Sequence, residues 1–192
     1  MLTSSPGFKP DLTTYSSDNF QRLYDLAEKL IQRGKAYVCH CGDAELKLQR
    51  GGEEGKTPRY RCAHAAQDVE TNLTKFRDMR DGKYEPGAAF LRMKQDMLGS
   101  GNPQMWDIGA YRIPKNRTPH FRTGHKWIIY PSYDFAHCLC DSFEEITHSL
   151  CTTEFIQARE SYNWLVKELE LYEPMQREFG KYLSYFICTR YS

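Results

Sequence analysis

The chain has 192 residues, a formal net charge of +1, and 40% hydrophobic and 14% aromatic residues. This composition is typical of a globular chain with one good core or two small ones, and it excludes an intrinsically disordered chain. The near-zero net charge gives no global indication of nucleic-acid binding. No apolar run approaches the length that spans a bilayer, so we expect no membrane partner. Seven cysteines, an odd number and several in apolar surroundings, favour reduced thiols in a cytoplasmic protein over a disulfide framework.

The N-terminal region predicts one helix and one strand. Residues 1–17 are rich in Pro, Ser and Thr and are expected to be extended. Residues 18–33 carry one apolar stripe, and we predict a helix that Asp18 caps and Gly34 ends. A short strand is predicted at 36–39. The polar, Gly-rich segment 51–58 does not have the glycine spacing of a phosphate-binding loop, so a surface loop is expected there.

The middle of the chain predicts a second helix over 68–81, ended by Gly82. Its expected inward positions are Val69, Leu73 and Phe76. Strands are predicted within 88–94 and 106–113. Short strands around one helix, without a βαβ rhythm, indicate an α+β unit over roughly 36–128.

Residues 111–127 are locally basic: they include five Lys or Arg, two His and no acidic residue. Such a stretch can bind phosphates, but charge alone favours an ordinary solvated face.

Four residues of the same region form a candidate metal set. Cys39 and Cys41, followed by Cys62 and His64, supply enough ligands for a tetrahedral ion. Their spacing is tighter than that of common zinc fingers, so we expect no metal, and zinc in particular is not expected.

The stretch YPSYDFAHCLCDSFEEITHSLCTTEF, residues 130–155, predicts a helix over 133–141 and a buried strand over 146–151. The next helix is expected over 154–169, with Phe155 on its apolar side and the hydroxyls of Thr152 and Thr153 at its start. Free N–H groups at such a helix start suit a phosphate, yet a buried βα unit without any site explains the pattern equally well. A further core strand is predicted at 175–179.

This stretch closely resembles the glutaminyl-tRNA synthetases, class I aminoacyl-tRNA synthetases, and residues 10–41, 69–94 and 121–179 resemble their catalytic domain in the same order. The resemblance implies an α/β fold: a partial Rossmann-type nucleotide-binding fold interrupted by an α+β insert that binds the tRNA acceptor end. It assigns 1–35 to the tail of the first half, 36–128 to the insert and 129–192 to the second half. It implies ATP-dependent charging of tRNA with glutamine through an aminoacyl-adenylate, with Mg²⁺ accompanying ATP. It also reverses the preference for a solvated face at 111–127.

The resemblance further implies substrate contacts for glutamine, carried over to matching positions: Tyr133, Asp134, Ser149, Cys151 and Gln176. Tyr133 is expected to distinguish an amide from a carboxylate, and Asp134 to orient its neighbours. Glutamate-specific relatives tend to carry arginine at the position of Cys151, so Cys151 favours glutamine. A core tyrosine and a packing cysteine are the alternatives for Tyr133 and Cys151.

For ATP, the resemblance implies contacts by Thr152, with a helix cap as the alternative role, and by Lys181, which keeps the charge but not the planar fork of a family arginine. The family's first ATP signature has no match in this sequence, and its lysine loop has at most a faint match at Thr189-Arg190. We therefore expect a partial catalytic domain that is inactive alone. The alternatives are a non-catalytic fragment that binds tRNA or docks to a multi-synthetase complex, and a glutamate-specific enzyme. Glu145 stands where relatives have Gly or His, and the sequence offers no interpretation of it.

Overall fold

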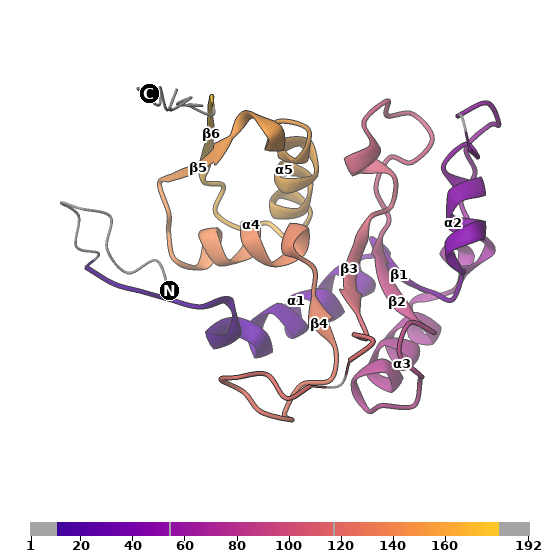
Figure 1. The fold of residues 1–192 in the computed structure, drawn as a ribbon, viewed down its shortest axis with the longest axis horizontal. Coiled ribbons are helices and arrows are strands. Elements are labelled where there is room, and N and C mark those ends of the chain that lie inside the picture. Colours follow the sequence, from indigo (N-terminus) through magenta and orange to yellow (C-terminus); the bar gives the residue numbers. More distant parts are fainter. Residues whose placement is uncertain (1–10, 54, 117, 181–192) are drawn as a thin grey trace, which may run out of the picture.

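The computed structural model describes residues 11–53, 55–116 and 118–180, which form a mixed α/β structure (Figure 1). Helix α1 (Phe20–Gln32) runs below α4 towards the larger sheet in this view, and the other elements form two groups. One contains the four-stranded sheet with α2 and α3, and the other contains α4, α5 and a two-stranded sheet. No helix in this part of the chain is long and apolar enough to cross a membrane.

Helix α1 buries the predicted apolar stripe, but it begins later than expected. A 3-10 turn, Ser16–Asn19, precedes it, and Asn19 rather than Asp18 is the N-cap. The Asp18 carboxylate instead accepts a hydrogen bond from the Tyr15 N–H (3.0 Å) and pairs with Arg122 (2.7 Å). Asp18 therefore stabilises the 3-10 turn, and the predicted cap was wrong.

The larger sheet is antiparallel, in the order β1 (Ala36–Cys39), β2 (Phe90–Met93), β3 (Gly109–Arg112) and β4 (Tyr130–Pro131). The predicted strand at 36–39 is confirmed, and those within 88–94 and 106–113 are confirmed as shorter strands.

Two helices, not one, accompany this sheet. Helix α3 (Val69–Arg80) was predicted, and its N-cap Asp68 accepts a hydrogen bond from the Thr71 N–H (2.8 Å). Helix α2 (Asp43–Gln49) was not predicted, because most of its seven residues are polar. Val69, expected inward, lies at the first turn of α3 and is exposed. A 3-10 turn, Ala63–Ala66, connects α2 to α3.

The second group forms a parallel βαβ unit. Helix α4 (Tyr133–Phe143) leads to β5 (His148–Thr152), and helix α5 (Ala158–Glu168) connects β5 to its parallel neighbour β6 (Met175–Phe179). The predicted helices and strands all exist. However, only Ser149 of β5 is buried, so the expectation of a buried strand was wrong.

The start of α5 also differs from the prediction. A 3-10 turn, Thr153–Phe155, follows β5, and α5 begins only at Ala158. The hydroxyls of Thr152 and Thr153 therefore do not cap α5. Phe155, expected on the apolar side of the helix, belongs to the turn and is exposed.

The position of Glu145 at the C-terminal end of α4 explains why relatives can have glycine there. After α4, Glu145 has a φ of 52°, its N–H bonds to the Ser142 carbonyl, and the Ile146 N–H bonds to the Asp141 carbonyl. This is the left-handed C-terminal cap that glycine adopts most easily. Gly34 occupies the same position after α1, with a φ of 68°. A glycine at position 145 in relatives would fit this backbone, and the glutamate is a strained but tolerated substitute.

One apolar core runs through both groups of elements. It includes residues of α1, α3, the larger sheet, α4 and α5. The division of the chain at 35/36 and 128/129 stays a prediction, because this core is continuous across both boundaries.

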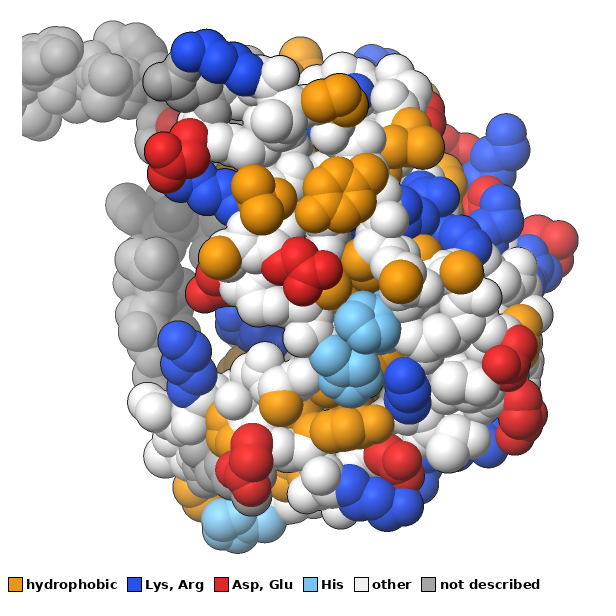
Figure 2. Space-filling view, turned by 90° about the vertical axis from the view of Figure 1, so that its right-hand side faces the viewer, with side chains coloured by type: hydrophobic (Ala, Val, Ile, Leu, Met, Phe, Trp, Pro, Cys, Tyr) orange, Lys and Arg blue, Asp and Glu red, His pale blue; other side chains and the backbone are white. Residues whose placement is uncertain are grey.

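The surface on the side of α2 carries mixed charge. Figure 2 shows acidic and basic side chains interspersed over this face, with hydrophobic side chains between them. No large field of a single sign covers the face in this view, in agreement with the small net charge.

Candidate functional site

A small pocket lies between α4, α5 and the two parallel strands. It contains four of the five predicted glutamine contacts, all except Ser149. The described residues that line the pocket are Tyr133, Asp134, His137, Cys151, Phe155, Ala158, Ser161, Tyr162 and Gln176. None of these lining residues is a lysine or an arginine. Cys151 lies near the carboxyl end of β5, the edge at which open α/β folds bind ligands, and Gln176 lies near the start of β6.

Gln176 and Cys151 lie side by side on β6 and β5. The Gln176 amide donates to the Cys151 sulfur (Nε2 to Sγ, 3.6 Å). Gln176 is 8% exposed, and its Oε1 is buried without a hydrogen-bond partner among the described residues. A buried carbonyl oxygen without a partner is costly, so this acceptor suits a ligand that brings an N–H group.

Ser149 lies beneath the pocket, where three side chains converge on Asp141. The Asp141 Oδ2 accepts from the Ser149 hydroxyl (2.6 Å) and the Tyr162 hydroxyl (3.2 Å), and it lies 3.1 Å from His137 Nε2. Burial opposes ionisation of Asp141, but the hydrogen bonds from His137 and Ser149 outweigh it and keep the pKa of this carboxyl below its usual value. Ser149 therefore holds the strand against α4 rather than lining the pocket.

Tyr133 and Asp134 differ in their surroundings. Tyr133 is 60% exposed, so it is not a core tyrosine, and its ring stacks on His137 with centroids 5.0 Å apart. Partial burial raises the pKa of Tyr133 and also that of Asp134. In the described part of the chain, the Asp134 carboxylate has no hydrogen bond to another side chain. Its expected orienting role stays a prediction.

Of the two residues expected to contact ATP, Thr152 belongs to the described part of the chain. Thr152 is partly buried, and its hydroxyl donates to the Glu154 carboxylate (3.2 Å) instead of capping a helix. Lys181 lies outside the described residues.

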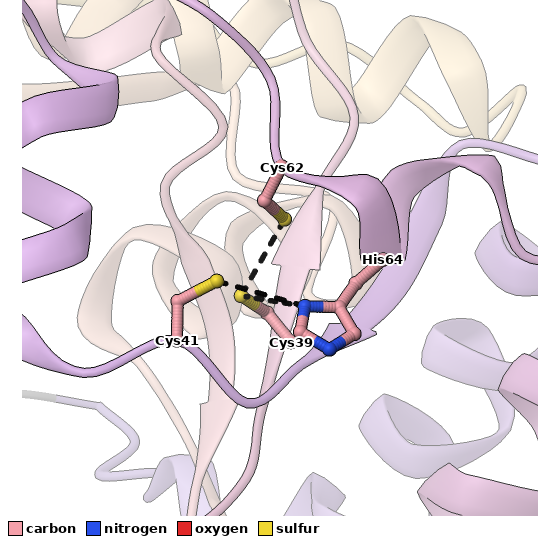
Figure 3. Close-up of side chains that lie close together, drawn as sticks. All are labelled: Cys39, Cys41, Cys62 and His64. Carbon is pink, nitrogen blue, oxygen red and sulfur yellow. Dashed lines mark hydrogen bonds between the residues drawn. The ribbon is translucent and has the colours of Figure 1, made fainter.

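The four candidate metal ligands come together at the end of β1. Cys39, Cys41 and Cys62 are buried, His64 is partly exposed, and their ligand atoms all lie within 4.8 Å of one another (Figure 3). A hydrogen bond from the Cys39 thiol lowers the pKa of Cys62 to about 4. All six described cysteines, the three of this cluster included, are free thiols.

The comparison with protein families decides the relationship of this chain. The model described as "tRNA synthetases class I (E and Q), catalytic domain" matches residues 4–182. The chain belongs to this family.

Curated relatives within this synthetase family are similar over nearly the whole chain. The "Glutamine--tRNA ligase protein virJ" of Hypocrea virens is 70% identical over 91% of this chain, and the "Glutamine--tRNA ligase" of Saccharomyces cerevisiae is 61% identical over 94%. The chain spans 27% and 22% of the lengths of these two relatives.

Solved structures support the fold of the synthetase family. The glutamate-tRNA synthetase of Elizabethkingia anophelis matches 92% of this chain with a TM-score of 0.56 at 16% identity, and the chain covers 38% of it. The glutamate tRNA ligase of Elizabethkingia meningosepticum matches 92% of this chain with a TM-score of 0.53 at 15% identity, and the chain covers 36% of it. At this identity the likeness concerns the fold alone, and it agrees with the expected Rossmann-type α/β architecture.

His137, Asp141 and Tyr162 were not among the predicted site residues. Their signal was present in part, because Tyr133, His137 and Asp141 recur every four residues and so share one face of α4. Tyr162 comes from α5, and no local pattern indicates that its hydroxyl meets Asp141.

Proposed function

We propose that this chain is part of a glutamine–tRNA ligase and that the pocket between α4 and the parallel strands binds the side chain of glutamine. The observation that carries the proposal is the chemistry of the pocket floor. Gln176 offers a buried carbonyl oxygen to an amide N–H, while no described lining residue offers a lysine or arginine to a carboxylate. Glutamate would therefore bury an uncompensated charge, at a cost that glutamine avoids.

The rest of the proposed activity follows from the family. ATP, accompanied by Mg²⁺, would activate glutamine as an adenylate, and the tRNA acceptor end would then take the acyl group. Positioning and cationic or N–H groups do most of the work in such reactions. Thr152 and Lys181 are the proposed ATP contacts, and 36–128 is the proposed acceptor-end unit. The name of an Arabidopsis thaliana relative, "Glutamine--tRNA ligase, cytoplasmic", supports a cytoplasmic location.

Glutamine binding is the first test, measured by ligand-observed NMR on the 192-residue chain with glutamate as the competitor. We expect glutamine to bind and glutamate to bind at least tenfold more weakly. Gln176→Ala removes the buried acceptor and should weaken glutamine binding about fivefold to tenfold, the equivalent of one hydrogen bond. Gln157→Ala is the matched control, because Gln157 is exposed and lies outside the pocket lining. Equal binding of glutamine and glutamate would refute the assignment.

Catalysis is tested separately by glutamine-dependent ATP–pyrophosphate exchange with bulk tRNA present and Tyr133→Phe as the comparison. Exchange above that of Tyr133→Phe would show that the chain carries its own phosphate-binding groups. No exchange from a chain that is folded by circular dichroism would support a partial catalytic domain. Salt-sensitive tRNA binding without exchange would favour the non-catalytic binding role instead.

A further inference from the structure

The Ser161 hydroxyl of α5 lines the proposed glutamine pocket together with Gln176. Ser161 is 3% exposed, and its oxygen accepts a hydrogen bond from the Gln95 side-chain nitrogen (Nε2 to Oγ, 2.7 Å). A serine hydroxyl can accept hydrogen bonds and has one proton to donate. The direction of the bond between Gln95 and Ser161 therefore decides where the Ser161 proton can go.

The surroundings of Gln95 determine the orientation of its side-chain amide. The Ile108 N–H donates to the Gln95 Oε1 (3.4 Å), and a backbone N–H can only donate. The Gln95 Nε2 also lies 3.8 Å from the Met105 sulfur, a weak acceptor. Turning the amide over would place two donors against each other at Ile108, so the Gln95 nitrogen must face Ser161. Because this nitrogen only donates, Ser161 is the acceptor and keeps its own proton for another partner.

The backbone of Gln95 is also held by hydrogen bonds. Gln95 follows β2 by two residues and is 6% exposed. Its N–H donates to the Asp107 carboxylate (2.9 Å), and its carbonyl accepts from the Arg61 guanidinium (2.6 Å). Arg61 and Asp107 form an ion pair with each other (2.7 Å). The larger sheet therefore presents the Gln95 amide to α5 in one position.

The Ser161 proton has no hydrogen-bond acceptor within the described part of the chain. Serines in helices often donate to a carbonyl of the preceding turn, but Ser161 forms no such bond to a described carbonyl. The Gln176 Oε1, which is buried without a donor among the described residues, is not bonded to Ser161 either. The pocket wall thus holds one free donor, the Ser161 O–H, and one free acceptor, the Gln176 Oε1.

The other described lining side chains offer no equally fixed donor. The Tyr162 hydroxyl donates to Asp141 Oδ2 (3.2 Å), and His137 Nε2 lies 3.1 Å from the same oxygen. The Cys151 thiol donates to a backbone carbonyl of β6 (3.8 Å). Tyr133 is 60% exposed, so solvent can pair with its hydroxyl in either role. The serine of α5 is therefore the buried donor of this pocket.

We propose that Ser161 and Gln176 bind the two ends of the substrate amide, and that Gln95 is the positioning residue that keeps Ser161 a donor. In this arrangement, which rests on the proposed function, the side-chain carbonyl of glutamine accepts from Ser161 and its NH₂ group donates to Gln176. A carboxylate can accept from Ser161 but has no proton for Gln176. Recognition of glutamine then depends on Gln95, a residue beside the larger sheet that does not touch the substrate.

Replacing Ser161 tests the donor. Ser161→Ala should weaken glutamine binding about fivefold to tenfold in the ligand-observed NMR assay, the loss of one hydrogen bond. The side-chain carbonyl of carbon-13-labelled glutamine should move downfield on binding to wild type, because a hydrogen bond polarises the carbonyl, and it should not do so with Ser161→Ala. Ser142→Ala should keep both properties, because Ser142 is a buried serine of α4 outside the pocket lining.

Replacing Gln95 by glutamate tests the positioning role. A carboxylate at this position accepts from both Ile108 and Ser161, so it turns the Ser161 proton away from the pocket. Gln95→Glu should weaken glutamine binding about as much as Ser161→Ala, and the double variant should lose no more than either single variant. If circular dichroism shows that Gln95→Glu is unfolded, Gln95→Leu replaces it. Gln95→Leu should weaken glutamine binding when Ser161 is present and have no effect when Ser161 is alanine.

The outcomes separate this inference from the proposed function. Glutamine binding by wild type with an equal affinity in Ser161→Ala, or with no carbonyl shift, would overturn this inference alone. Losses that add in the double variant would show that Gln95 acts independently of Ser161 and would overturn its positioning role. A folded wild-type chain that does not bind glutamine would overturn the proposed function and this inference together.

Discussion

Replacing Asp141 by asparagine tests the hydrogen bonds beneath the proposed glutamine pocket. The Asp141 Oδ2 receives hydrogen bonds from Ser149 and Tyr162 and lies 3.1 Å from His137 Nε2. Asparagine keeps the shape and one acceptor oxygen but removes the charge. A hydrogen bond to a charged group contributes about 1 kcal/mol more than a neutral one, so three such contacts amount to about 3 kcal/mol. Relief from burying the charge returns about 1 kcal/mol, which leaves a destabilisation of about 2 kcal/mol.

Urea unfolding at neutral pH, followed by tryptophan fluorescence, measures this difference, and the melting temperature should fall by about 4–8 °C. The stabilisation that Asp141 contributes should also depend on pH. Because the folded-state pKa of Asp141 is lowered, its contribution is present above the unfolded pKa and disappears as pH falls through the folded value. The difference in unfolding free energy between Asp141→Asn and wild type should therefore disappear at acidic pH.

The control is Asp134→Asn on the first turn of the same helix. Burial raises the pKa of Asp134, and its carboxylate has no hydrogen bond to another described side chain. We expect a change within about 0.5 kcal/mol. An Asp141→Asn change no larger than this control would refute the reasoning, because the convergent hydrogen bonds would then contribute nothing.

Two further predictions concern stability. Glu145→Gly should stabilise the chain by about 0.5–1 kcal/mol in the same urea assay, because glycine adopts the φ of 52° without strain; Glu170→Gly should gain less, since Glu170 also forms an ion pair. A destabilised Glu145→Gly would contradict the strained-cap interpretation. Arg77 hydrogen-bonds Glu28 with two nitrogens and lowers its pKa, so this pair joins α1 to α3. Arg77→Ala should destabilise the chain above the ordinary glutamate pKa and lose this effect as pH falls further; an offset that does not change with pH would show that the pair acts by packing alone.

Local residue patterns were sufficient to predict most of the helices and strands. Periodic apolar residues located α1, α3, α4 and α5. Gly34 and Gly82 marked two helix ends, because glycine adopts the left-handed conformation there most easily. The family motif also followed from the sequence, since it is a property of residue order. The short polar helix α2 was missed because its seven residues carry little apolar periodicity.

The contacts between distant side chains, in contrast, depend on how the elements pack together. Cys39 and Cys62 are 23 residues apart, and only the packing of the 3-10 turn against β1 brings their sulfurs to 3.7 Å. Asp141 and Tyr162 likewise meet through the packing of α4 on α5. Periodicity reports which face of an element is apolar, but it carries no information about which polar group on a distant element comes opposite. That depends on strand pairing and helix packing, which the chain settles only when the whole core forms.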